Sequence, residues 1–296
     1  MVRAVVVHYR GLEDTRACLA SLEVDAVLVD NSGRGEGADL ARREFARVLP
    51  IDPGRNTGFA GGCNLGMRAA LEAGADHILL LNSDATLAPG AVEALVAAAG
   101  QPGVGIVTGK VLVAGSDPPR IWSAGGALHP LRGIGVNVGE GEADRGQHDR
   151  ARDVDFASGC LLLATRAALE RVGLFDERYF LYLEDVDLCL RARRAGFRVR
   201  YEPRAVARHR VHGATGGADD GGAATPTALY YLTRNRHLLV RRHHPLRYPL
   251  FLAYNAVARA ARIAAALVRG RRERARAEAQ GFRDGLVGRF GPGPAA

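Results

Sequence analysis

Clusters of acidic and amide residues that could carry chemistry follow apolar runs typical of β-strands. Asn82, Ser83 and Asp84 come directly after one such run, and Asp30 ends an earlier one. Ligands in open α/β sheets bind beyond the carboxyl ends of strands, so polar residues at these points predict a binding site. Asp84 could instead cap a helix, but the next predicted helix begins five residues later, which weakens that interpretation.

The segment Glu184–Asp187 holds three carboxylates in four residues, framed by apolar neighbours. Such crowding is electrostatically costly unless a ligand or a reaction uses the charge. On a helix, Asp187 can pair with Arg191 one turn later, which is a structural role. Asp185 lies about 100° from Glu184 on a helical wheel and is the carboxylate best placed to face a cleft alone. Favourable electrostatics at a helix start is the alternative explanation.

A glycine-rich segment, Asn56–Gly66, opens a predicted helix. Glycine lets the backbone approach a ligand closely, and the amide groups of a helix start attract anions. The spacing matches neither the P-loop nor the dinucleotide fingerprint, so a tight turn explains the segment equally well. His209 and His212 end a predicted strand beside another glycine-rich segment. That setting suits a ligand-gated loop, although a lone histidine is more often structural.

Apolar runs alternate with helical patterns along the first hundred residues, which predicts βαβ units and a mostly parallel sheet. The pattern loosens between residues 100 and 160, where we expect a surface loop or flap over 139–153. The expected strands cover 4–8, 26–30, 49–52, 77–82, 156–164, 197–201 and 205–209. The expected helices cover 12–22, 38–48, 62–73, 89–99, 165–172, 184–195 and 227–242.

The composition of the 296 residues, 47% hydrophobic and 24% charged, is that of a globular protein and excludes a disordered or collagen-like chain. The four cysteines lack metal-ligand spacing and fit buried, reduced thiols in a cytoplasmic protein. The N-terminal apolar run is too short for a signal peptide, and no uncharged run reaches the roughly 18 residues that a membrane span needs.

Positive charge is concentrated in the C-terminal tail. The net charge is +8, yet residues 229–296 hold 14 arginines and three acidic residues, so residues 1–228 are slightly acidic. This distribution, without interleaved aromatic and basic residues, argues against a nucleic-acid binder. Within the tail, a polar stripe runs along an otherwise apolar helix over 251–268, which suits an anionic membrane surface. Packing on the rest of the chain or on a second subunit is the alternative. The stripe consists of Asn255, Arg259, Arg262 and Arg269.

In this order and spacing, the clusters resemble the family 2 glycosyltransferases with the GT-A fold, especially a bacterial rhamnosyltransferase-like branch. The similarity implies a GT-A catalytic domain over residues 1–228, with a mostly parallel sheet flanked by helices, and a basic helical extension over 229–296. The segments that carry it are Val5–Tyr9, Leu12–Thr15, Asp30–Ser32, Asn56–Gly66, Asn82–Asp84, Ser158–Cys160, Gly173–Glu177, Glu184–Leu188, His209, Tyr230–Tyr231 and Arg234–Asn235.

The resemblance implies a nucleotide-diphosphate sugar as donor, held by a divalent cation (Mg²⁺ or Mn²⁺). Asp84 matches the last aspartate of the D-x-D motif, Asn82 replaces the first, and His209 matches a further metal or diphosphate ligand. Asp185 matches the general base, with Glu184 as the fallback. The expected contacts with the donor are His8, Tyr9, Asp30, Asn31, Asn56, Gly58, Asn64, Asn82, Ser83 and Asp84.

Elementary chemistry agrees with these roles. A departing nucleotide builds negative charge that a cation neutralises, and an acceptor hydroxyl needs a carboxylate to take its proton. One base and no enzyme nucleophile imply a single displacement with inversion at the anomeric carbon. Two positions depart from the family's pattern: Arg10 replaces a frequent asparagine, and Val211–Thr215 stands where a serine-rich turn is usual. His212 therefore competes with His209 for the ligand role.

The branch resemblance makes dTDP-L-rhamnose the expected donor and cell-surface polysaccharide or glycolipid assembly the expected setting. Two alternatives stay open: transfer from a UDP-sugar to a small-molecule acceptor, and a relative that binds nucleotide sugars without catalysis. The expected location is cytoplasmic, and peripheral on the inner face of the plasma membrane if the tail binds lipid. The sequence does not indicate an oligomeric state.

Overall fold

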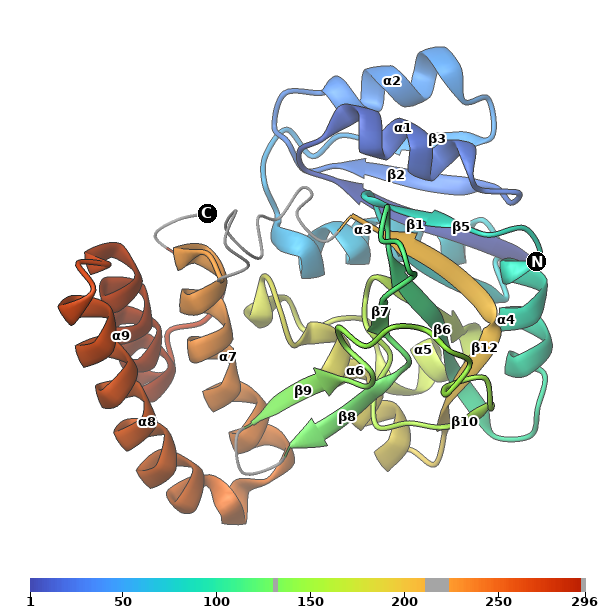
Figure 1. The fold of residues 1–296 in the computed structure, drawn as a ribbon. Helices are drawn as coiled ribbons and strands as arrows, with labels where there is room; N and C mark the ends of the chain where they lie inside the picture. The colour runs from blue at the N-terminus through green and yellow to red at the C-terminus, as the bar shows by residue number, and fades with distance from the viewer. Residues whose placement is uncertain (130–132, 211–223, 294–296) are drawn as a thin grey trace.

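The computed structural model describes residues 1–129, 133–210 and 224–293. Its centre is a ten-stranded mixed sheet with the main order β10-β12-β6-β11-β4-β1-β2-β3, to which β5 adds on β12 and β7 on β6 (Figure 1). The strands are β1 (Val2–His8), β2 (Ala26–Asp30), β3 (Val48–Ile51), β4 (His77–Asn82), β5 (Ala85–Leu87), β6 (Val104–Val113), β7 (Ile121–Ser123), β10 (Arg152–Asp153), β11 (Leu161–Thr165) and β12 (Arg198–His209). A separate hairpin joins β8 (Gly126–His129) and β9 (Ile134–Asn137).

The N-terminal half has the alternating, parallel arrangement that the sequence predicts. β1 pairs in parallel with β2 and β4, and β3 adds in parallel to β2. Beyond β4 the sheet is mixed, because β11 runs antiparallel between β4 and β6. The predicted α/β class is confirmed. The helices of this domain are α1 (Leu12–Ala20), α2 (Glu36–Glu44), α3 (Gly58–Glu72), α4 (Ala91–Ala99), α5 (Arg166–Val172), α6 (Glu184–Arg194) and the short 3-10 helix η1 (Glu177–Tyr179).

Alternating side chains of the central strands build one core on each face of the sheet. Val5 and Val7 of β1 enter the core that also contains residues of α3, α5 and α6. Ala4 and Val6 enter the opposite core, with residues of α1, α2 and α4. All four cysteines are free and buried, as predicted. The two cores leave the carboxyl ends of β1, β2 and β4 along one edge of the sheet.

The loosened pattern after residue 100 is misleading, because residues 104–113 form β6, a buried strand of ten residues. Its glycines are required by close packing. A Cβ at Gly105 would lie 2.7 Å from the Phe197 ring, and one at Gly109 would overlap the carbonyl oxygen of Ala205. The expected surface segment over 139–153 does consist of turns, apart from β10.

Three other expected boundaries are also wrong. The two strands expected over 197–209 are one strand, β12, with a register shift between Glu202 and Val206. The strand expected from residue 156 begins only at Leu161. Helix α3 begins at Gly58 rather than residue 62, so most of the glycine-rich segment is helical.

The tail forms three helices beside the sheet domain (Figure 1). α7 (Pro226–His243) matches its prediction and begins at Thr225, whose hydroxyl accepts a hydrogen bond from the Ala228 amide. A 3-10 turn, η2 (Pro245–Arg247), leads to α8 (Tyr248–Val268) and then α9 (Arg272–Val287). Leu238 and Leu239 of α7 belong to a core of the sheet domain, so the predicted boundary after residue 228 falls inside a shared helix.

Half of the polar stripe of α8 faces the protein, and the expected contact of this helix with an anionic membrane surface stays a prediction. Asn255 and Arg259 are buried. Arg259 and Arg262 pair with Glu278 of α9 at 3.5 and 2.8 Å. The alternative, packing on the rest of the chain, holds for Asn255 and Arg259, whereas Arg262 and Arg269 are exposed.

Candidate active site

One cavity of about 590 Å³ brings together predicted site residues from distant parts of the chain. Asn82 comes from the end of β4, His209 from the end of β12, and Glu184 and Asp185 from the first turn of α6. Phe59, from the glycine-rich segment, also lines the wall, together with residues that the sequence reasoning did not single out, among them Trp122, Glu140 and Leu232. The sequence neighbourhoods of these three carry no distinctive spacing.

Strand pairing fixes the first polar pair of the site. β5 runs antiparallel to β12 with Ala85 opposite His209, which places Asp84 beside that histidine. The His209 Nε2 atom lies 3.0 Å from Asp84 Oδ1. Burial alone would lower the pKa of His209, but the neighbouring Cys160 and Asp84 raise that pKa to about 10. The edge of the Trp122 ring packs against the imidazole, with ring centroids 4.7 Å apart.

Asp185 lies where backbone amides can stabilise a buried carboxylate. Its Oδ2 accepts a hydrogen bond from the Gly159 amide at 2.8 Å, and its Oδ1 accepts one from the Val186 amide at 2.7 Å. Burial raises the pKa of Asp185, while these two amides oppose the rise. Burial and the nearby Asp185 charge raise the pKa of Glu184 well above its usual value. Asp185 is therefore the carboxylate that ionises first.

Asp187 has the structural role that its spacing predicts. Its carboxylate binds Arg191 Nε at 2.7 Å and His243 Nε2 at 2.7 Å. Burial alone would raise the pKa of Asp187, but the His243 hydrogen bond and the Arg191 charge outweigh it and lower that pKa. Asp187 thereby fastens α6 to the end of α7.

The loop before α6 is strained, and α7 holds it. Phe180, Tyr182 and Leu183 all have left-handed backbones, with φ of 62°, 69° and 73°. Such backbones cost about 1–3 kcal/mol each and persist only where the surroundings impose them. Asn235 of α7, fully buried, donates from Nδ2 to the carbonyls of Tyr179, Leu181 and Tyr182 at 2.8–2.9 Å.

Arg234 supports this arrangement from the same helix. Its Nε donates to Asn235 Oδ1 at 2.9 Å, and its Nη2 donates to the Tyr179 carbonyl at 2.9 Å. The Arg234–Asn235 pair carries part of the family resemblance, but its residue types alone indicate no role. It is the positioning element that the sequence reasoning missed.

Two residues predicted to contact the donor are fully buried and bonded within the protein. The Asp30 carboxylate accepts the amides of Gly37 and Ala38 at the start of α2, at 2.7 and 3.0 Å. His8 lies 2.8 Å from the Thr15 hydroxyl through Nδ1. Both therefore shape the edge of the sheet. Tyr9, next in the chain, is half-buried beneath Arg10, whose guanidinium lies 5.0 Å from the ring centroid.

The amide side chains of the predicted donor region fasten the start of α3. Asn31 Nδ2 donates to the Gly58 carbonyl at 2.7 Å, and Asn56 Oδ1 accepts the Gly58 amide at 2.9 Å. Gly58 also approaches the loop before α6, because a Cβ there would lie 2.5 Å from the Phe180 carbonyl oxygen. These contacts tie the glycine-rich segment to the Asp185 loop.

Asn64 and Ser83 are both buried and do not line the cavity. Asn64 exchanges two hydrogen bonds of 2.9 Å with the backbone of Phe175 and donates to Glu177. Its predicted contact with a donor stays a prediction. His212, the rival of His209, lies outside the described residues.

The Asp84 carboxylate fits a divalent cation shared with a substrate, and His209 would join it as a ligand when a cation displaces its proton. His209 Nδ1 is buried without a hydrogen-bond partner among the described residues. The described part of the chain has no group of three or more His, Cys, Asp or Glu residues that could enclose a metal. Mg²⁺ commonly takes one or two protein ligands and completes its shell with water and substrate phosphates. The donor set therefore suits a cation bound together with a diphosphate.

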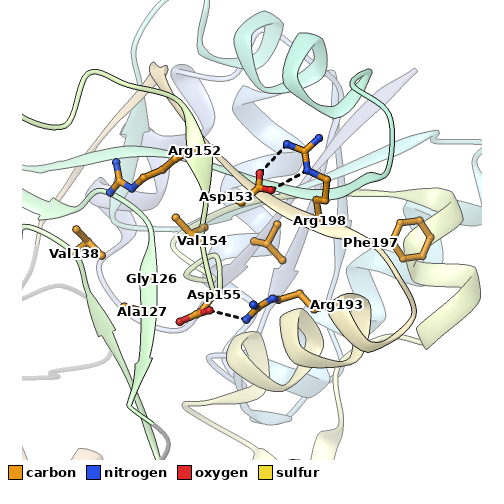
Figure 2. Close-up of a pocket in the computed structure, with 11 residues that line it drawn as sticks. Gly126, Ala127, Val138, Arg152, Asp153, Val154, Asp155, Arg193, Phe197 and Arg198 are labelled. Atoms are coloured by element: carbon orange, nitrogen blue, oxygen red, sulfur yellow. Dashed lines mark hydrogen bonds and ion pairs between the residues drawn. The ribbon is translucent and has the colours of Figure 1, made fainter.

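A second hollow of about 390 Å³ lies beside β10 and β12, and it does not compete with this site. Figure 2 shows its charged side chains satisfied by each other: Arg198 pairs with Asp153, and Arg193 pairs with Asp155. Arg152 donates to the Ala124 carbonyl at 2.8 Å. Because each of these arginines and aspartates is already paired within the protein, the hollow offers a charged ligand few unpaired partners among the described residues.

Comparison with solved structures identifies the fold. GalNAc-T7 with UDP, GalNAc and Mn²⁺ superposes with a TM-score of 0.60 at 14% identity, covering 81% of this chain and 47% of that one. A mannosyltransferase of Pyrobaculum calidifontis in complex with GDP-Man and Mn²⁺ gives 0.54 at 15% identity, covering 97% and 87%. The predicted GT-A fold is confirmed.

Comparison of sequences identifies the family. An N-acetylglucosaminyl-diphospho-decaprenol L-rhamnosyltransferase of Mycobacterium tuberculosis is 30% identical over 234 residues, which cover 72% of this chain and 76% of the relative. A low-salt glycan biosynthesis hexosyltransferase of Haloferax volcanii is 25% identical over 198 residues, and the match spans only 62% of that relative. Residues 26–227 match the model described as Glycosyltransferase like family 2. The chain belongs to the family 2 glycosyltransferases.

Proposed function

We propose that this chain transfers a sugar from a nucleotide-diphosphate donor to an acceptor hydroxyl, with inversion at the anomeric carbon. The observation that carries the proposal is the single cavity bordered by Asp185 on one element and by His209, with Asp84 behind it, on another. One end of the cavity has a buried carboxylate, and another has a pair suited to a cation and a diphosphate.

Asp185 is the proposed general base. A general base must be ionised and must also bind a proton readily. The two amide donors stabilise the ionised carboxylate of Asp185, and its burial raises its affinity for a proton. The acceptor hydroxyl loses its proton to Asp185 as its oxygen attacks the anomeric carbon and the bond to the diphosphate breaks. Glu184 is the fallback base, because burial and the neighbouring Asp185 charge raise its pKa well above the usual value.

Asp84 and His209 would hold a Mg²⁺ or Mn²⁺ ion, with Asn82 nearby. Such an ion, when bound, neutralises the charge that develops on the leaving diphosphate. The Mn²⁺ in the two solved neighbours supports this assignment. Asn82, at the end of β4, stands where the family's motif has its first aspartate. It would offer the ion a neutral amide oxygen in place of a second carboxylate.

For the donor we propose dTDP-L-rhamnose, and for the acceptor a saccharide carried on a lipid diphosphate. The mycobacterial relative, named for L-rhamnose transfer to N-acetylglucosaminyl-diphospho-decaprenol, supports both choices. The reaction would then serve cell-surface polysaccharide or glycolipid assembly, on the cytoplasmic side of the membrane.

Binding and turnover measured separately would test the site. A panel of dTDP-, UDP- and GDP-sugars is titrated calorimetrically with Mn²⁺ and again with EDTA. Asp84→Ala should abolish metal-dependent binding, whereas Asp39→Ala, an exposed aspartate on α2, should not. Asp185→Asn should retain donor binding and lose about 10²–10⁴ in kcat. Full turnover by that variant would refute the base, and metal-independent binding would refute the cation site.

A further inference from the structure

Helix α8 exposes an apolar face that the rest of the chain leaves uncovered. Leu250, Tyr254, Val257, Leu267 and Val268 are 62%, 39%, 73%, 54% and 89% exposed. Leu250, Tyr254, Val257 and Val268 follow one another at intervals of four, three and eleven residues, with alanines on the same side between the last two, so these four lie along one side of the helix. Leu267 lies about 100° away from that side. Figure 1 shows α8 at the outer edge of the molecule, away from the sheet.

This exposure is not the fraying of a loose helix, because the opposite side of α8 is fastened. Phe251 is fully buried against His237 of α7, with ring centroids 5.3 Å apart. Arg259 and Arg262 pair with Glu278, which is itself buried on α9. The helix has therefore turned two polar side chains, Asn255 and Arg259, inward and most of its large apolar side chains outward, unlike a helix adapted to water.

Charge around the face is uniformly positive. Residues 245–272 contain six arginines and no acidic residue. Arg247 is exposed at the start of α8, and Arg269, Arg271 and Arg272 are exposed just beyond its end. Exposed apolar residues between clusters of arginine complement a bilayer with anionic headgroups, because the apolar side chains enter the acyl boundary and the arginines meet the negative charge.

A basic hollow adjoins the same end of α8. It has a volume of about 340 Å³, and Arg262, Arg269, Arg271 and Arg274 contribute to its wall. Ala224 borders both this hollow and the candidate active site. Phosphate groups at a membrane surface would meet these arginines at the end of α8.

We propose that the exposed face of α8 docks this protein on an anionic phospholipid bilayer, with the flanking arginines on the headgroups. The proposal does not depend on the sugar-transfer reaction. The segment Pro245–Val268 is long and apolar enough to cross a membrane, and its most apolar stretch of 18 residues is only 17% buried in the chain. Spanning would require Arg259 and Arg262 to leave Glu278, so we place α8 along the surface.

Vesicle flotation of the full chain tests the docking. The chain is mixed with vesicles of phosphatidylglycerol and phosphatidylcholine, or of phosphatidylcholine alone. We expect flotation with the anionic vesicles, and at least tenfold weaker partitioning for Val257→Glu. The matched control is Leu49→Glu, since Leu49 is 48% exposed on β3 at the other end of the molecule, and it should float like the wild type. Circular dichroism confirms that each variant is folded.

The arginines are tested by reversing charge. Arg269→Glu/Arg271→Glu should weaken flotation at least tenfold, whereas Arg42→Glu/Arg43→Glu on α2 changes the net charge equally and should not. Failure of the wild type to float, or wild-type flotation by Val257→Glu, would overturn the proposal. So would resistance to alkaline carbonate extraction, which indicates a spanning helix. A dimer that Val257→Glu dissociates, without flotation, would assign the face to a second copy of the chain instead.

Discussion

Replacing Asn235 by alanine should damage stability and catalysis together, because one buried amide holds the strained loop before Asp185. Its Nδ2 has two hydrogens, which serve three carbonyls at 2.8–2.9 Å, and its Oδ1 accepts from Arg234. A buried group left without a partner costs about 1–3 kcal/mol, and the three left-handed residues add strain that the amide opposes. We expect Asn235→Ala to lower the free energy of unfolding by about 2–4 kcal/mol.

The kcat of the same variant should fall by a larger factor than the factor by which its KM for the donor rises. The loop leads directly into Glu184 and Asp185, and a displacement of about 1 Å at a catalytic group costs about 10²-fold in rate. Hydrogen exchange of residues 179–185 gives a readout that needs no activity, and those amides should exchange faster in the variant.

A matched control separates the loop from general loss of a buried amide. Asn255 of α8 is also buried, but its Nδ2 has one partner, the Phe251 carbonyl of its own helix at 3.0 Å. Asn255→Ala should cost about 1 kcal/mol and leave kcat unchanged. If Asn235→Ala unfolds no more easily than Asn255→Ala, or keeps the wild-type kcat and exchange rates, the positioning role is refuted.

Two further predictions concern stability. Burial and the nearby Arg241 charge lower the pKa of His237 to about 4, below its unfolded value of about 6.5, so the folded state resists protonation. Stability should therefore fall by about 3 kcal/mol as pH drops from about 6.5 to about 4, and denaturant titrations should show a much smaller fall for His237→Phe. An equal fall in both proteins would contradict this assignment. Gly58→Ala should cost at least about 2 kcal/mol more than Gly54→Ala, because both glycines have positive φ but only a Cβ at Gly58 meets other atoms, at 2.5 Å. Equal unfolding midpoints for Gly58→Ala and Gly54→Ala would show that Phe180 can move away from a Cβ at residue 58 without loss of stability.

The parts of the fold that local pattern controls were predictable. Alternating apolar runs located β1, β2 and β4, and helical spacing located α6 with Asp187 paired to Arg191. The carboxyl ends of strands correctly indicated where polar residues gather. Local rules suffice there, because each side chain acts on neighbours one strand or one helical turn away.

The failures arise where a distant segment decides the local structure. The sequence of β6 looks irregular because it contains Gly105 and Gly109. These glycines are needed where Phe197 and Ala205, nearly a hundred residues later in the chain, pack closely against the strand. Its Lys110, the chain's single lysine, is buried because Asp144 and Asp149 reach it from a surface turn. The stripe on α8 likewise reads as outward-facing until Glu278 is placed opposite it. For β6 no short window of sequence contains both partners, and for α8 the sequence does not show how the next helix packs against it.

The predicted division after residue 228 lies inside α7, and this position bears on how the enzyme is assembled. The loop that presents Asp185 is held by Arg234 and Asn235, which lie beyond that boundary. The end of the chain closes on the same point: Arg234 Nη1 donates to the Gly291 carbonyl, and the Gly291 amide donates to the Arg178 carbonyl at 2.8 Å. Helix α7, which packs with α8 and α9, is therefore hydrogen-bonded to the backbone of the loop that positions the proposed base, Asp185. A chain ending at residue 228 would lack Arg234 and Asn235, which hold the loop, as well as the exposed apolar face of α8. It should therefore lose catalysis even toward a water-soluble acceptor.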